Sequence, residues 1–132
     1  MIRKLSIILF VVLTSAFTIL AQTTNQQQKA VILKPVFYVE DITFAVNALN
    51  SIEITGTEVD NFLKAKSTLL STLQKAQKQT KNQKDTIQID IEINIAQSIV
   101  NFLGKAKFSA SQAEQYKRFI DAIVESTKKY KE

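Results

Sequence analysis

The sequence predicts an all-α fold: a four-helix bundle made of two tandem helical hairpins, preceded by an export signal. Three observations favour this fold class. Only two Gly and one Pro occur in 132 residues, too few for the many turns of a β-sandwich or barrel. Apolar residues recur at helical spacing, and similar stretches repeat at an offset of 54 residues. The chain has no Cys, so packing without disulfides must hold the fold together.

The first 21 residues contain the three regions of a secretory signal peptide in their usual order. Arg3 and Lys4 give a basic start, and an apolar run and a region of small residues follow. We expect cleavage after Ala21, with cleavage after Ala16 as the alternative. The apolar stretch is short for an anchor that spans a bilayer. The sequence therefore predicts an exported protein, periplasmic or extracellular, that is not an integral membrane protein after cleavage.

Removing the signal changes what the composition implies. Loss of Arg3 and Lys4 leaves 15 basic residues against 12 acidic ones, so the net charge falls from +5 to +3. Such a mild bias does not indicate a nucleic-acid partner, and export argues against one. We expect a flexible polar leader over residues 22–30. Residues 31–132 are long enough for a single helical domain with its own core.

Two nine-residue stretches, which begin at Ile54 and Phe108, keep the residue type at most positions. Each contains the spacing of a capping box: the pairs are Thr55 with Glu58 and Ser109 with Gln112. In such a box the hydroxyl and the longer side chain satisfy free backbone N–H groups at a helix start. Each repeat therefore reads as a helix, a tight turn and a second helix. The two hairpins, 31–80 and 85–132, would together form the bundle.

One segment has two interpretations. Alternate positions from 87 to 95 are all Ile, and the residues between them are polar, a pattern typical of a half-buried strand. Ile87, Ile91 and Ile95 also lie at steps of four, as on one face of a helix, and Asp85 or Thr86 can cap a helix that begins there. We favour one long helix from about Thr86 to Lys105. The alternative is an α+β fold with two short strands near residues 31–39 and 86–95.

The sequence offers little for catalysis. It has no His and no Cys, which removes the commonest nucleophile–base pairs and zinc ligands. The two Gly are isolated, so no glycine-rich phosphate loop is possible. Acidic residues such as Glu58 and Asp60 lie two apart, and on a helix such side chains point away from each other. We therefore expect a non-enzymatic protein with no cofactor and no metal site.

Phe37, Tyr38 and Phe44 surround the start of the first expected helix. Not all three can face the core together with the apolar residues around them, so we expect an exposed aromatic contact for a partner. The sequence thus favours a small exported helical protein that acts as an interaction or envelope-associated module. Its partner would be an unknown protein or envelope component. The alternatives are a carrier of a small apolar ligand or lipid between the helices and, third, a carboxylate-only hydrolase.

Overall fold

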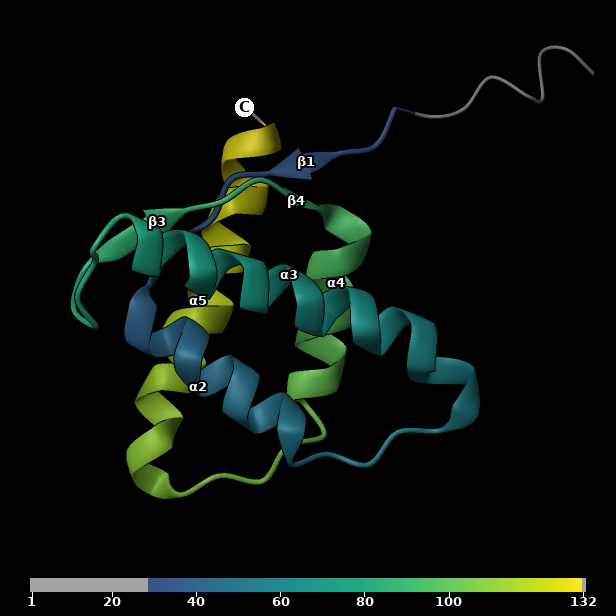
Figure 1. The fold of residues 1–132 in the computed structure, drawn as a ribbon. Helices are drawn as coiled ribbons and strands as arrows, with labels where there is room; N and C mark the ends of the chain where they lie inside the picture. Colours follow the sequence, from purple (N-terminus) through teal and green to yellow (C-terminus); the bar gives the residue numbers. More distant parts are fainter. Residues whose placement is uncertain (1–28, 132) are drawn as a thin grey trace, which may run out of the picture.

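The computed structural model describes residues 29–131. The expected signal peptide and most of the expected leader lie outside these residues. In chain order, the elements are β1 (Ile32–Leu33), β2 (Val36–Tyr38), α2 (Val39–Asn50), η1 (Gly56–Glu58), α3 (Val59–Lys78), β3 (Thr86–Gln88), β4 (Ile91–Glu92), α4 (Ile93–Leu103), η2 (Ala110–Gln112) and α5 (Ala113–Lys131). The described part of the chain is therefore mostly helical, with two short antiparallel strand pairs (Figure 1).

Each half of the chain contributes a strand segment followed by two helices. The strands of the two halves pair with each other: β1 pairs with β4 and β2 pairs with β3, both antiparallel. The two pairs share one register, so they form a single two-stranded ribbon, interrupted at its middle. The ribbon lies at one end of the molecule, and the connections between the helices of each half lie at the other (Figure 1).

The ribbon has a pseudo-two-fold axis at its centre, where Pro35 faces Ile89. These two residues are equivalent in the two repeats, and the Ile89 N–H donates to the Pro35 carbonyl at 3.2 Å. Proline has no N–H to return the bond. Two flanking hydrogen bonds obey the same symmetry: Val39 N–H to the Asp85 carbonyl at 3.0 Å, and Ile93 N–H to the Val31 carbonyl at 2.9 Å. The internal repeat of the sequence is thus a structural repeat.

The expected long helix over 86–105 is wrong in its first part. Residues 86–92 form β3 and β4, and α4 begins only at Ile93. Both interpretations bury Ile87 and Ile91, but only the strand also buries Ile89 on the same face. The residues of 31–38 supply the partner strand, which satisfies the backbone groups that a helix would otherwise have satisfied internally.

The two predicted helix starts are confirmed. Capping boxes are present at Thr55 and at Ser109. The backbone N–H of Thr55 donates to the Glu58 carboxylate at 3.0 Å, and that of Ser109 donates to the Gln112 side-chain oxygen at 3.0 Å. Each box opens a 3-10 turn that leads directly into α3 or α5. The connection between the halves runs from Gln79 to Asp85, because α3 ends at Lys78 and β3 begins at Thr86.

The core lies between the inner face of the ribbon and the helices. The inward strand residues are buried: Leu33, Pro35, Phe37, Ile87, Ile89 and Ile91. Among the helices, α2 packs against α3 and α5, and α3 packs against α4. The rings of Phe37 and Phe119 stack with their centroids 4.6 Å apart, which joins β2 to α5. Phe44 and Phe108 meet edge to face at 5.8 Å and join α2 to the second half.

Replacing Phe119 by Ala should lower the free energy of unfolding by about 3–5 kcal/mol, because both rings of the stacked pair are buried. Urea denaturation followed by circular dichroism measures this change. Val124→Ala on the same helix is the matched control, since Val124 is 44% exposed and surface changes stay within about 0.5 kcal/mol. Equal losses in the two variants would contradict the assigned core.

Candidate functional site

The three aromatic residues predicted as a partner contact do not share one surface. Phe37 and Phe44 are buried in the core. The ring of Phe37 packs against Phe119, and the ring of Phe44 packs against Phe108. Tyr38 is 42% exposed, with its ring 5.3 Å from the guanidinium carbon of Arg118. Of the three, only Tyr38 is therefore exposed, and Phe37 and Phe44 do not contribute to an exposed aromatic contact. A partner contact at Tyr38 stays a prediction.

The outer face of the ribbon carries an apolar row that lies on one strand segment. Side chains alternate between the two faces of a strand, so Ile32, Lys34, Val36 and Tyr38 face outward. The three apolar ones are 40%, 46% and 42% exposed, and Lys34 lies between Ile32 and Val36. The facing strand presents polar residues there, with Gln88 opposite Val36 and Thr86 opposite Tyr38. We call Ile32, Val36 and Tyr38 the ribbon row. It is an exposed apolar feature on a segment whose position is set by strand pairing.

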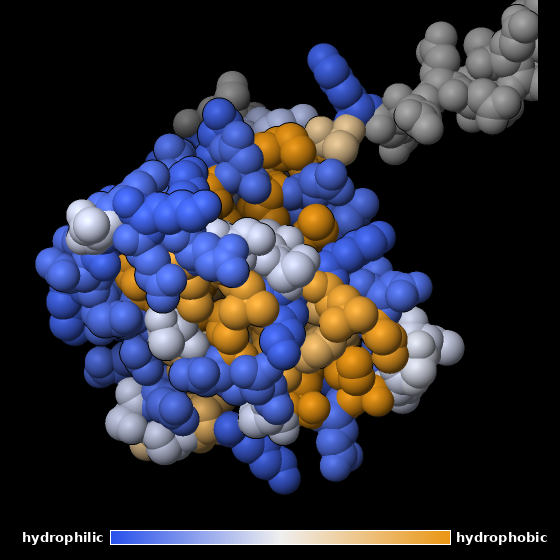
Figure 2. Space-filling view, viewed as in Figure 1, coloured by the Kyte–Doolittle hydropathy of each residue, from blue (hydrophilic) through white to orange (hydrophobic). Residues whose placement is uncertain are grey.

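A second exposed apolar row lies on α3. Val59, Leu63 and Leu70 face away from the core, and Leu63 is 55% exposed. Figure 2 shows hydrophobic surface at the lower right, over the region that the first half of α3 occupies in Figure 1. A further hydrophobic area lies near the position of β1 at the top of the same view. Polar surface separates the two areas, so they are distinct features.

The acidic residues that open α2 are bound by basic side chains. Arg118 Nη2 lies 2.8 Å from Glu40 Oε1 and 2.7 Å from Asp41 Oδ1. Lys84 Nζ lies 3.0 Å from Glu40 Oε2. This cluster ties α2 to α5 and to the connection between the two halves. Because Asp41 is almost fully buried and is engaged by Arg118, the pair is best explained as part of the fold.

The pKa values of the two carboxyl groups, Asp41 and Glu40, are shifted in opposite directions. Burial raises the pKa of Asp41 above its ordinary value, and the hydrogen bond from Arg118 only partly opposes this. The hydrogen bond from Lys84 lowers the pKa of Glu40. Divergent pKa values in adjacent carboxyls can mark acid–base catalysis. Here the divergence follows from the burial of Asp41 and from the hydrogen bond that Lys84 donates to Glu40 within one ion-pair cluster.

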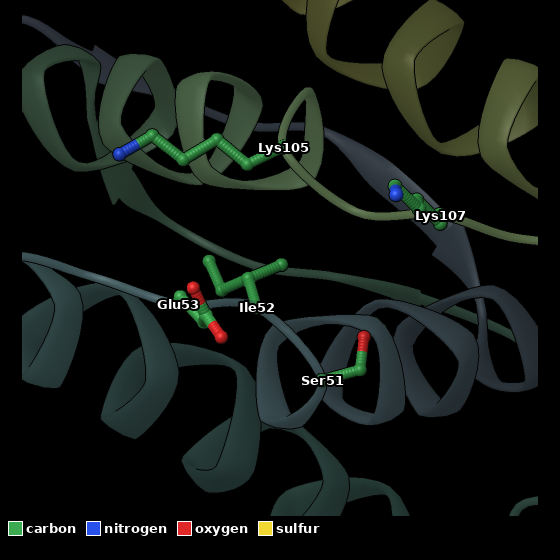
Figure 3. Close-up of a pocket in the computed structure, with 5 residues that line it drawn as sticks. All are labelled: Ser51, Ile52, Glu53, Lys105 and Lys107. Carbon is green, nitrogen blue, oxygen red and sulfur yellow. The ribbon is translucent and has the colours of Figure 1, made fainter.

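A polar hollow of about 430 Å³ lies between the two interhelical connections, at the end opposite the ribbon. Its lining includes Lys105, Lys107 and Glu53 (Figure 3). In Figure 3 the Lys105 side chain extends away from Lys107, so their ammonium groups do not converge. Lys105 instead forms an ion pair with Glu58. The hollow therefore lacks the converging charges that an anion site requires.

The two hairpins differ in how closely their helices pack. The repeat makes α2–α5 equivalent to α3–α4, and both of these contacts are present. It also makes α2–α3 equivalent to α4–α5. Yet α2 packs closely along α3, whereas α4 and α5 barely approach each other. A groove of about 340 Å³ lies between α4 and α5, and we call it the α4–α5 groove.

The α4–α5 groove is aliphatic and uncharged. Its aliphatic residues come from β1 and both helices: Leu33, Ile93, Ala96, Val100 and Ile123. Gln97, Asn101 and Thr127 also line it. Gln97 and Asn101 are exposed and Thr127 is half-buried, whereas Leu33, Ala96 and Ile123 are buried. The groove therefore has an apolar floor, and its carboxamides lie at the solvent side.

Sequence reasoning missed this groove, although one signal was present. Aligning the repeats places Thr127 where the first half has Leu73, and Ile123 where it has Leu69. A Leu-to-Thr difference on an otherwise apolar helix stripe indicates that this position no longer packs against a neighbouring helix. Only the helix packing shows that the missing partner is α4.

The chain matches no known family model, and no curated protein or solved structure is significantly similar to it. Within residues 29–131, no helix is both long enough and apolar enough to cross a membrane.

Replacing Asp41 by Asn should change how stability depends on pH. The folded state holds the Asp41 proton more tightly than the unfolded chain does, since burial raises the pKa. The wild type therefore loses free energy of unfolding as pH rises from about 3.8 through the raised pKa. The variant lacks this loss, so its stability relative to wild type should increase with pH over that interval. Urea denaturation between pH 3 and 7 measures the difference.

Glu40→Gln is the matched control for that measurement. The folded pKa of Glu40 is lowered, so its carboxylate stabilises the fold above the ordinary value of about 4.5. That contribution is lost as pH falls through the folded pKa. The deficit of this variant relative to wild type should therefore shrink at low pH. Profiles of the same sign for both variants would contradict the assigned cluster.

Proposed function

We propose that this protein is an exported, non-enzymatic interaction module that binds a protein partner through the ribbon row. The observation that carries the proposal is the outward position of Ile32, Val36 and Tyr38 on one strand segment. Exposed apolar rows beside polar residues are typical of protein contact sites. Tyr38 adds a rigid side chain with both an apolar ring and a polar hydroxyl, a type enriched at interfaces.

The backbone of the same segment supports a protein partner over a small ligand. In the ribbon the inter-strand hydrogen bonds involve odd-numbered residues such as Pro35 and Val39. The backbone groups of Val36 and Tyr38 therefore point away from the facing strand. Each sheet among the described residues has only two strands, so this edge has no further strand beside it. An extended partner segment could add there, with the ribbon row giving side-chain contacts.

The remaining chemistry is consistent with binding without catalysis. The carboxylates that open α2 are engaged by Arg118 and Lys84, and Glu58 is engaged by Lys105. Export, as proposed from the first 21 residues, would give envelope or extracellular proteins access to the ribbon row. A binding module needs only a stable scaffold and one surface, and the paired repeats supply both.

Val36→Asp should abolish partner binding while leaving the fold intact, because Val36 is half exposed and an acid there removes the apolar contact. The mature chain would be immobilised and exposed to envelope extract, and the retained protein would be quantified by mass spectrometry. We expect at least a tenfold loss of the retained partner in the variant. Urea midpoints within error of wild type would show that both proteins are folded.

Leu63→Asp is the matched control, because it makes the same kind of change in the exposed row of α3. Its binding should equal that of wild type. Retention that survives Val36→Asp but is lost in Leu63→Asp would move the site to α3 and contradict the proposal. A wild-type chain that retains no partner specifically would contradict it as well.

A further inference from the structure

We infer that the α4–α5 groove is a binding site for an uncharged amphiphile, a molecule with an aliphatic part and a neutral hydroxyl, ester or amide head. This inference goes beyond the proposed function and concerns a different surface. Its first support is the comparison between the two halves of the chain. The same topology closes α2 onto α3 but leaves α4 apart from α5. The opening is therefore a property of the second half's sequence and does not follow from the fold.

Ala96 lines the groove at the position where the closed hairpin has Ile42, and the second smaller residue is Thr127. Its equivalent in the closed hairpin is Leu73, which packs against the core. Thr127 is smaller and carries a hydroxyl, so the second hairpin has less apolar side chain at this position. The neighbouring Ile123 keeps the apolar character of its equivalent, Leu69. The groove therefore combines an unfilled volume with a wall that still favours aliphatic contact.

The size of the groove suits a small ligand. Its volume of about 340 Å³ lies at the lower end of the roughly 300–1,000 Å³ typical of ligand sites. The floor residues Leu33, Ala96 and Ile123 come from three different elements, and each of these elements is fixed by core packing. An aliphatic chain placed between α4 and α5 would thus meet a preformed surface.

The charge of the lining selects a neutral ligand. None of the lining residues is acidic or basic, so the groove offers no counter-charge to a carboxylate or ammonium head. Gln97 and Asn101 lie one helical turn apart on α4 and offer both donors and acceptors. A hydroxyl, ester or amide can be satisfied by these carboxamides. Charge complementarity thus favours a neutral head over either charged one.

The test compares three probes with the same chain length: monodecanoyl glycerol, decanoate and decyltrimethylammonium, each below its aggregation threshold. Methyl NMR of the mature chain would follow Ala96, Val100 and Ile123. We expect saturable shifts of these methyl signals with the neutral probe, and at least tenfold weaker binding of both charged probes. Absence of saturable shifts, or equal binding of all three probes, would overturn the inference.

Thr127→Leu introduces the residue found in the closed hairpin. It should weaken binding of the neutral probe at least tenfold without lowering the urea midpoint. Thr68→Leu is the matched control: it makes the same change on α3, outside the groove, and should leave binding unchanged. Unaltered binding in Thr127→Leu would show that the probe binds elsewhere and would overturn the inference.

Gln97→Glu provides an independent arm that does not depend on how Thr127→Leu folds, because Gln97 is exposed. A negative charge at the edge of the groove should reverse the preference, so that the cationic probe binds more tightly than the neutral one. An unchanged order of the three probes would contradict the assigned site. Val36→Asp should leave probe binding intact, so failure of the proposed partner contact and failure of this site are distinguishable.

Discussion

The antiparallel pairing of the two strand segments is the constraint on which the rest of the structure depends. Neither segment is long enough to be stable by itself, and each runs directly into a helix: β2 into α2 and β4 into α4. The register of the ribbon therefore fixes where both helices begin. A slip of one residue would turn Phe37 outward and Val36 inward, and so exchange the core face for the solvent face. The hydrogen bonds centred on Pro35 and Ile89 set the positions of both halves together.

On this symmetric frame, the two halves differ at the positions that matter for binding and stability. Phe37 stacks on Phe119 on one side of the axis, and the equivalent pair is Ile91 and Ala65. Asp41 with Arg118 on the first side has the equivalents Ile95 and Lys64, which cannot form an ion pair. The third difference, Leu73 against Thr127, accompanies the α4–α5 groove. Divergence between repeats, and not the shared frame, thus distinguishes the candidate sites.

Local features of the fold could be predicted from the sequence, and non-local ones could not. The capping boxes at Thr55 and Ser109 act within four residues, so their spacing sufficed. The strand at 86–92 depends on a partner at 31–38, and the paired residues lie 48 to 60 positions apart in the chain. Its alternating Ile residues allowed either a strand or a helix while that partner was unknown, and the steps of four among them favoured the helix. The burial of Phe44 likewise depends on Phe108, a residue of the other repeat. What the sequence left open was decided by contacts between the halves.

The same distinction explains why the ribbon row and the α4–α5 groove differ in origin. The ribbon row follows from strand alternation alone, because a two-stranded ribbon packed on one face must expose the other. The groove is not forced in this way, since the first hairpin shows that the topology permits close packing of its helices. Leaving it open forgoes about 0.8 kcal/mol for each methylene group that closure would bury. A ligand with an aliphatic part would recover that free energy on binding. The open hairpin is therefore the feature of this chain that a purely structural role explains least well.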